Sequence, residues 1–434
     1  MGPGVSRGRV ADAAWIVAGA AAAALGTILG VRLMTGLVDA GLFGQVSLLL
    51  GIVVLMTSVA ASPIAQAAIH FYPAAAEQDQ LAALATGARR PLHRALSGSV
   101  VVLVAGAGVA VALDLADPLD LALVCALLLT DGWRTLRLSV LNAARRHRRY
   151  STWVAADAWL RPLAAAGAVY AFGADVSLVL AAHLAVALLL SAVLGRGPWP
   201  GQPSGTAPSA ARCGEFERVV REYALPLVPL GLLAWIVNLG DRFVIGGLLG
   251  AAEAGIYAAA YGLSSAPLMM IAGTVEQAVR PHYQAAVSAG SIRHADRLLS
   301  LWLASVAGGC LIAWLAFVAW HQAIASLLLG PDFRAAAALM PWIALGYMLR
   351  AIASVLERVC YGHARTRRVL QIQLGTAITA VVATPVATAT FGLRGAVAAL
   401  IASFAVQLWL SARLAVLSRR EVAAMRHAPG VVSA

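Results

Sequence analysis

The chain has 434 residues, of which 61% are hydrophobic and only 12% are charged, and its mean hydropathy is +0.81. A soluble domain carries about 25% charged residues, so this composition excludes a soluble protein and predicts an all-α integral membrane protein. The net charge is +12 and every basic residue is arginine, but the arginines form short separate clusters rather than one patch, which argues against a nucleic-acid-binding protein.

Apolar runs recur along the whole length and predict about twelve transmembrane helices, since about 20 helical residues cross a bilayer core of about 30 Å. The first six spans lie near residues 13–37, 43–71, 98–114, 119–142, 152–172 and 177–195. The last six lie near residues 224–249, 255–280, 298–320, 337–360, 369–390 and 395–417. Residues 196–222 are rich in proline, glycine and serine and predict a flexible cytoplasmic linker. The predicted domains are therefore two six-helix bundles, 1–195 and 223–434, on either side of this linker.

The loops between the spans alternate in charge. Arginine-rich segments follow even-numbered spans, among them GARRPLHR after the second, ARRHRRY after the fourth and GHARTRR after the tenth. The opposite loops, such as LDLADPLD and GADV, are acidic or nearly neutral. The positive-inside rule therefore predicts that both termini are cytoplasmic.

Two pairs of similar segments indicate an internal duplication. VDAGLFGQVS at 38–47 resembles AEAGIYAAAY at 252–261, and the segment that begins at Phe172 resembles the one that begins at Phe391 with nearly the same shift. An even number of spans in each half gives both halves the same orientation. We therefore expect two bundles related by a pseudo-twofold axis along the membrane normal, with a substrate site between them.

Charged residues within the predicted spans are the candidate functional residues, because each costs about 2.5–3.5 kcal/mol at the centre of a membrane helix. The deeper basic positions are Arg32, Arg134, Arg137, Arg161, Arg242 and Arg350. The deeper acidic positions are Asp131, Asp157 and Asp241. The surplus is positive, and guanidinium groups bind phosphate through paired hydrogen bonds. The pattern predicts an anionic substrate.

Some of these charges could instead pair with one another. Counting outward from the turn between the fourth and fifth spans places Arg137 level with Asp157, which predicts an ion pair and leaves Arg161 over. Asp131 and Arg134 are one helical turn apart and could also pair. Interfacial pairs are expected for Glu276–Arg280 and for Glu357–Arg358, while Arg350 has no evident partner.

Two positions near the outer side leave alternatives open. Arg32 either reaches the outer interface by snorkelling or faces a cavity. For Asp241–Arg242, roughly 25 Å up the seventh span at 1.5 Å per residue, a cavity is favoured because the short aspartate reaches less far. In LPLVPLG, Pro226 and Pro229 are expected to weaken the helix at the start of this span.

The region YALPLVPLGLLAWIVNLGDRFVIGGLLGAAEAGIYAAAYGL resembles the seventh and eighth spans of Wzx-type polysaccharide and O-antigen flippases. These belong to the multidrug/oligosaccharidyl-lipid/polysaccharide superfamily. The shared pattern is a proline at the helix start, Asp-Arg-Phe, Leu-Gly and Gly-Ile-Tyr, here at Pro226, 241–243, 249–250 and 255–257. LLLGPDFRAAAALMPWIALGYML at 327–349 and GLFGQVSLLLGI are also similar to that family.

The resemblance implies a MATE-like transporter in the bacterial inner membrane that moves an undecaprenyl-diphosphate-linked oligosaccharide to the outer leaflet by alternating access, for surface polysaccharide or lipopolysaccharide. It implies coupling to a proton or sodium gradient, which no residue pattern in the sequence indicates, and no cofactor. Family likeness places Arg242, Asp241 and Arg32 in the substrate cavity. The charge argument adds Arg161, Arg350 and Arg134.

Several other functions are compared with the sequence features below. A cation-coupled multidrug exporter of the same superfamily is the main alternative and would be expected to show a surplus of acidic residues. The sequence lacks a Walker A motif and a large outer loop, which argues against ATP use and against a membrane-embedded glycosyltransferase or polymerase. We therefore predict that the chain is not an enzyme. A major-facilitator transporter and a lipid II flippase fit less well, because the loop motif of the former and the additional spans of many of the latter are not found.

Overall fold

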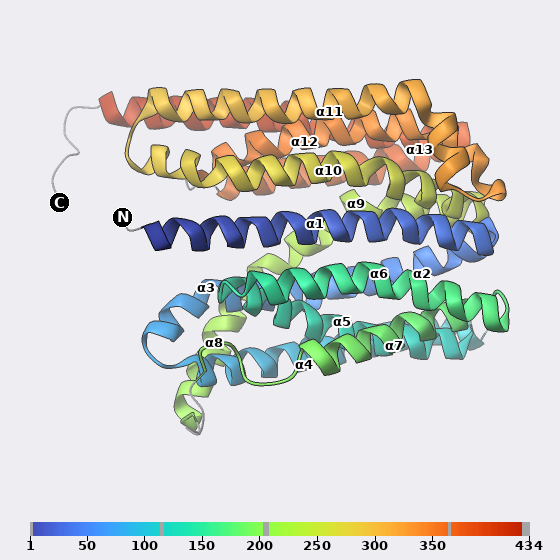
Figure 1. Cartoon of the computed structure of the whole chain (residues 1–434), viewed down its shortest axis with the longest axis horizontal. Helices are drawn as coiled ribbons and strands as arrows, with labels where there is room; N and C mark the ends of the chain where they lie inside the picture. The colour runs from blue at the N-terminus through green and yellow to red at the C-terminus, as the bar shows by residue number, and fades with distance from the viewer. Residues whose placement is uncertain (1–2, 113–116, 203–207, 363–365, 428–434) are drawn as a thin grey trace. The chain divides into compact units, whose positions relative to one another are not determined.

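The computed structural model describes residues 3–112, 117–202, 208–362 and 366–427, and every regular element in these ranges is a helix (Figure 1). Each of the twelve predicted spans overlaps a long helix or one part of a bent one. Seven helices of the described chain are long and apolar enough to cross a membrane, or eight if a bent pair at 331–360 is one span. The predicted all-α integral membrane fold is confirmed.

The first six predicted spans correspond to the helices that open the chain. These are α1 (Pro3–Leu37), α2 (Ala40–Ala60), α3 (Ser62–Glu77), α4 (Leu81–Ala112), α5 (Pro118–Ala143), α6 (His147–Phe172) and α7 (Val176–Leu194). The second span is broken into α2 and α3 at Ala61, beside Pro63, which has no backbone N–H and occupies the first turn of α3.

The predicted flexible linker is partly a helix. Residues Ala210–Ala224 form α8, which packs against α3 and α4. Cys213, Phe216 and Val220 recur at helical spacing; Phe216 and Val220 pack in a hydrophobic cluster with residues of α3 and α4, and Cys213 is buried. Glu217 accepts a hydrogen bond from Arg94 at 2.5 Å. The proline- and glycine-rich composition of 196–222 hid this short amphipathic pattern, so the expectation of flexibility is wrong from Ala210 onward.

The second half of the chain follows α8 without a gap. Its elements are η1 (Leu225–Leu227), α9 (Val228–Leu249), α10 (Ala251–Ser288), α11 (Ile292–Leu328), η2 (Pro331–Ala338), α12 (Met340–Gly362) and α13 (Thr366–His427). The 3-10 turn η1 contains Pro226, as expected for a helix weakened there. The eleventh and twelfth spans form the single element α13, which bends at Gly392, where φ is +60°.

The chain divides into two compact units, Met1–Trp235 (unit 1) and Ile236–Ala434 (unit 2). The division falls inside α9, later than the predicted start of the second bundle at residue 223, because the first turns of α9 pack on α2. A Cβ on Gly231 would lie 2.2 Å from the carbonyl oxygen of Ser58, so only glycine allows this approach. The Trp235 indole N–H donates to the carbonyl oxygen of Gly51 at 2.9 Å.

Within unit 1, α1 packs closely along α6. A Cβ on Gly26 would lie 2.8 Å from Trp159, and one on Gly30 would lie 2.8 Å from Pro162. The two glycines of GTILG, at 26–30, thus allow α1 and α6 to pack closely. In the similar segment GGLLG, at 246–250, Gly250 has φ +99° and joins α9 to α10, with nothing within 4 Å of the position of its missing Cβ.

Candidate functional site

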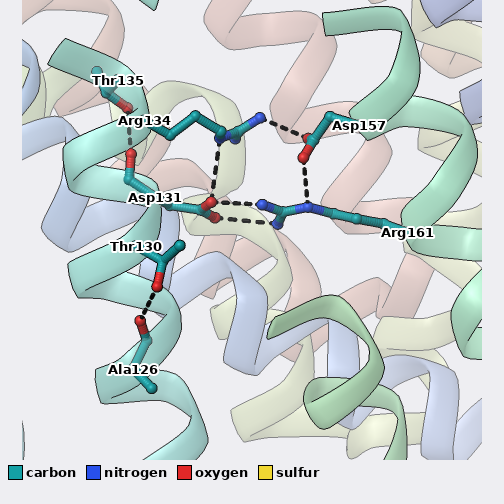
Figure 2. Close-up of polar contacts among 7 residues, drawn as sticks. All are labelled: Ala126, Thr130, Asp131, Arg134, Thr135, Asp157 and Arg161. Atoms are coloured by element: carbon teal, nitrogen blue, oxygen red, sulfur yellow. Dashed lines mark hydrogen bonds and ion pairs between the residues drawn. The ribbon is translucent and has the colours of Figure 1, made fainter. Parts of the chain in front are cut away.

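In unit 1, two carboxylates and two guanidinium groups form one network between α5 and α6 (Figure 2). Arg161 donates to the two oxygens of Asp131 at 2.5 and 3.1 Å and to Asp157 at 2.8 Å. Arg134 donates to Asp157 at 2.6 Å and lies 3.2 Å from Asp131. Each arginine therefore contacts both aspartates. We call Asp131, Arg134, Asp157 and Arg161 the four-charge network.

The four-charge network is electrically balanced and mostly buried. The exposed fractions of its side chains lie between 11% and 20%. Charges in such a setting attract one another strongly, and breaking one pair leaves the other charges uncompensated. Arg161 binds carboxylate oxygens through all three of its guanidinium nitrogens, and Arg134 contacts both carboxylates. The two positive charges are thus balanced within the network, which makes it poorly suited to hold a further anion.

Two expected pairings in this region are corrected. Arg137 does not pair with Asp157, because equal height on two helices does not place two residues on facing sides. It donates instead to the carbonyl oxygens of Arg196 at 3.4 Å and Gly197 at 3.1 Å, beyond the end of α7. The expectation that Arg161 lacks a partner is also wrong. The expected Asp131–Arg134 pair is present.

Arg32 is exposed on α1. A Cβ on Gly36 would lie 3.1 Å from a terminal guanidinium nitrogen of Arg32, so this side chain extends toward the C-terminal end of α1. The positive-inside pattern predicts that this end is the outer one. The direction favours snorkelling over a cavity role for Arg32.

In unit 2, Asp241 is buried on α9 and is held from two sides. The hydroxyl of Tyr257, on α10, donates to one carboxylate oxygen of Asp241. The backbone N–H of Arg242 donates to the other oxygen at 2.8 Å. A buried carboxylate requires such donors, because an unsatisfied charge in this environment is costly. Asp241 therefore directs the neighbouring part of α9 onto α10.

Arg242 lies over an aromatic ring and begins a chain of ring contacts. Its guanidinium carbon is 4.4 Å from the centroid of Tyr261, on α10. Tyr261 meets Tyr347, on α12, edge to face at 5.2 Å, and Tyr347 meets Phe404, on α13, at 5.3 Å. Tyr347 also donates a hydrogen bond to the hydroxyl of Tyr261.

Arg350 lies at the other end of this chain of rings. Its guanidinium carbon is 5.2 Å from the centroid of Phe404 and 5.7 Å from that of Tyr347. Its Nη1 is buried and has no hydrogen-bond partner among the described residues. Cation–π contact orients a guanidinium group without using its N–H donors, so these stay available to an anion.

We call these seven side chains the arginine–aromatic cluster. They lie within unit 2 on α9, α10, α12 and α13, and they are Asp241, Arg242, Tyr257, Tyr261, Tyr347, Arg350 and Phe404. The seven include two guanidinium groups and one carboxylate, so their formal sum is positive. Of the four aromatic positions, sequence analysis named only Tyr257, as part of the Gly-Ile-Tyr motif and without a role at the site. Tyr257 and Tyr261 are four residues apart on one helix face, which was the available signal.

The expected interfacial pairs at the other end of α12 are partly right. Glu276 pairs with Arg280 at 3.2 Å, as expected. Arg358 pairs with Glu276 at 2.9 Å and not with Glu357. Glu357 accepts a hydrogen bond from Gln407 at 2.8 Å.

Comparison with known proteins confirms the resemblance seen in the sequence. A family model described as "Polysaccharide biosynthesis protein" matches residues 208–290, a region that contains Asp241, Arg242, Tyr257 and Tyr261. No sequence among the curated proteins matches the chain.

Solved structures share the fold over nearly the whole chain at low identity. An inward-facing multidrug resistance MATE family transporter of the MOP superfamily is 12% identical, with a TM-score of 0.62 over 95% of this chain and 96% of that chain. The lipid II flippase MurJ, in an inward closed conformation, is 12% identical, with a TM-score of 0.64 over 90% of this chain and 84% of that chain. A MOP superfamily transporter from Pyrococcus furiosus is 13% identical, with a TM-score of 0.54 over 95% of this chain and 97% of that chain.

These solved structures are of transporters and a flippase, and they show that the chain has their fold. The chain is thus an integral membrane protein with the MATE-like fold of MOP-superfamily transporters, and its residues 208–290 match a polysaccharide biosynthesis family.

Proposed function

We propose that the protein is a flippase that moves a lipid-diphosphate-linked oligosaccharide from the cytoplasmic to the outer leaflet of the bacterial inner membrane by alternating access. The lipid would be undecaprenyl diphosphate, and the glycan would serve surface polysaccharide biosynthesis. Both termini would be cytoplasmic, in line with the positive-inside pattern. A proton or sodium gradient would drive transport.

The observation that carries this proposal is the state of Arg350. Its guanidinium group rests on Tyr347 and Phe404, with one buried nitrogen that has no hydrogen-bond partner among the described residues. A buried donor without a partner is unfavourable by about 1–3 kcal/mol, and an incoming phosphate oxygen would relieve that penalty. Arg242 is oriented by the same chain of rings and adds a second positive charge to the arginine–aromatic cluster, which favours an anionic substrate.

We assign anion binding to Arg242 and Arg350, with Asp241 as the group that positions α9. Arg134 and Arg161 are placed outside the binding role, because Asp131 and Asp157 balance their positive charges. The match of residues 208–290 to a polysaccharide biosynthesis family supports a glycan substrate. The multidrug exporter shares the fold and differs in the charge expected at the site: a cationic drug would require excess carboxylate, whereas the named cluster has excess guanidinium.

The test is transport in proteoliposomes that contain the purified full-length protein. The probe is a fluorescent undecaprenyl-diphosphate oligosaccharide, quenched from outside by dithionite, and a cationic dye serves as the rival substrate. We expect translocation of the lipid-linked glycan and none of the dye. Arg242→Ala should abolish translocation while the protein stays folded by gel filtration and thermal unfolding.

The matched control is Arg218→Ala, which removes one exposed arginine of α8 and should leave transport unchanged. Normal translocation by a stable Arg242→Ala variant would refute the role given to Arg242. Dye transport without glycan transport would replace the proposed function by that of a drug exporter.

A further inference from the structure

A basic pocket lies in unit 1, away from both charged clusters described above. Its volume is about 690 Å3, within the range of roughly 300–1,000 Å3 that is typical of ligand sites. It lies where α5 ends, α6 begins and α7 ends. This end of unit 1 is the cytoplasmic end under the positive-inside rule.

The lining of the pocket is strongly one-sided in charge. Half of its lining residues are basic, and none of them is acidic: the basic ones are Arg145, Arg146, His147, Arg148 and Arg149. Among the described residues, none of the four arginines forms an ion pair with a carboxylate. Leu141 and Leu194 also line the pocket, which adds apolar surface beside the charges.

Helix α6 adds a further positive contribution. It begins at His147, and its first turn has no acidic residue and no side-chain cap. The N–H groups of a helix start carry about half a positive charge and favour anions. The Nδ1 atom of His147 is buried without a hydrogen-bond partner in the described chain, so the ring nitrogen is a further polar atom available to a ligand.

The walls of the pocket are fixed by contacts with the rest of unit 1. Arg149 donates to the carbonyl oxygens of Leu194 and Arg196, which ties α6 to the segment after α7. Trp199 is buried in the core of unit 1, and Tyr72 donates to the carbonyl oxygen of Pro200 at 2.5 Å. The pocket is therefore built by tertiary contacts and is not only a group of solvated surface arginines.

We propose that this pocket binds the phosphate headgroup of a membrane lipid at the cytoplasmic surface. Basic pockets between transmembrane helices on this side of a membrane suit anionic headgroups, and each nearby arginine strengthens such binding. Guanidinium groups hold phosphate oxygens through paired donors, and the apolar side chains suit the start of a lipid tail. Two lipids share this chemistry: an anionic phosphoglycerolipid and a polyprenyl diphosphate.

The test uses the full-length protein in detergent, titrated and observed by native mass spectrometry. Phosphatidylglycerol, phosphatidylcholine, undecaprenyl diphosphate and inorganic pyrophosphate are added separately. We expect at least one of the two anionic lipids to bind about tenfold more tightly than phosphatidylcholine. The preferred anionic lipid identifies the source of the headgroup. Equal binding of phosphatidylcholine, or binding of pyrophosphate without either anionic lipid, would overturn the proposal.

The location is tested by Arg145→Gln/Arg146→Gln, since both side chains are exposed and line the pocket. We expect about tenfold weaker binding of the anionic lipid. The control Arg212→Gln/Arg218→Gln removes the same charge from exposed positions of α8 outside the pocket and should change binding by less than about twofold. Equal losses in the two double variants would show unspecific charge attraction and refute the site.

A variant that keeps all charges gives independent evidence. Thr152 is exposed and lines the pocket, so Thr152→Phe should fill part of it and weaken lipid binding about tenfold without changing the net charge. Unchanged binding would refute the pocket as the site. Because lipid binding is measured without transport, its outcome is distinguishable from success or failure of the proposed flippase activity.

Discussion

Arginines inside the two units are held in opposite ways. In unit 1, Arg134 and Arg161 are each shared between the same two aspartates, and the four charges cancel. In unit 2, Arg242 and Arg350 rest on the faces of aromatic rings, which contribute no formal charge. Both arrangements stabilise a guanidinium group in an apolar setting, but only the first balances its positive charges with an equal number of carboxylates.

This difference shows that a count of arginines within membrane spans overstates the positive charge that a substrate meets. The total surplus deduced from the sequence is real, but the four-charge network contributes nothing to it. The arginine–aromatic cluster, with two guanidinium groups and one carboxylate, keeps a positive formal charge.

Removal of a carboxylate from the four-charge network should have the largest effect. Asp131→Ala leaves both Arg161 and Arg134 with one partner fewer, and we expect the free energy of unfolding to fall by about 3–5 kcal/mol. Thermal unfolding in detergent measures the loss. Glu215→Gln, which removes an exposed partner of Arg212, is the control and should change stability by less than about 1 kcal/mol. Similar values for the two variants would contradict a structural role for the network.

Removing charged side chains from unit 2 should lower transport, whereas a charge-balanced removal from the four-charge network of unit 1 should leave transport nearly unchanged. We expect Arg350→Gln to lower lipid-linked glycan transport by about 100-fold, equivalent to about 2.7 kcal/mol, because a phosphate contact is lost. The charge-balanced double variant Asp131→Asn/Arg161→Gln keeps the Arg134–Asp157 pair and should retain transport within about threefold. Initial transport rates in proteoliposomes compare the two variants. Equal losses of transport in both would show that the charges of the two units do not differ in function.

A change of cation type at Arg350 should have an intermediate effect. Arg350→Lys keeps the positive charge but loses the planar group that stacks on Phe404 and binds phosphate with two donors. We expect about tenfold slower transport with unchanged expression. A fully active lysine variant would show that charge alone, and not the geometry set by the rings, is what the site requires.

The smallest effect is expected at Tyr261, the first ring of the chain of rings. Tyr261→Phe keeps the ring under Arg242 but removes the hydroxyl that donates to the carbonyl oxygen of Asn238 at 2.8 Å. The free energy of unfolding should fall by about 1 kcal/mol, and transport should change little. Tyr261→Ala is the informative companion, because it removes the ring as well. If both variants transport equally well, the ring does not position Arg242.

Hydropathy predicted the long helices well, because an apolar run in lipid has few alternatives to a helix. The hydropathy pattern did not predict features of the fold that depend on local packing. The break at Ala61 depends on a proline position, and helix α8 depends on apolar residues whose spacing was hidden in a segment rich in proline and glycine. The second bundle was predicted to start at residue 223, but the first turns of α9 belong to unit 1. This boundary depends on the close contact of Gly231 with α2, which the sequence does not indicate.

Side-chain pairing was predicted correctly only for residues on one helix. Asp131–Arg134 and Glu276–Arg280 follow from helical spacing alone. Pairing between helices was wrong for Arg137, since the rotation of each helix about its own axis is not encoded in residue height. The chain of rings joins residues up to 143 positions apart (Tyr261 to Phe404), and no local pattern indicates such contacts.

By itself, the sequence determined that this chain is a helical membrane protein with arginine-rich loops on one side and excess arginine within its spans. These properties follow from composition and from the cost of exposing backbone and charge to lipid. Only the tertiary structure decided which arginines are neutralised by carboxylates and which lie on aromatic rings. That outcome depends on which helix faces meet, because a carboxylate balances the charge of a guanidinium group, whereas an aromatic ring orients the group and leaves its positive charge in place.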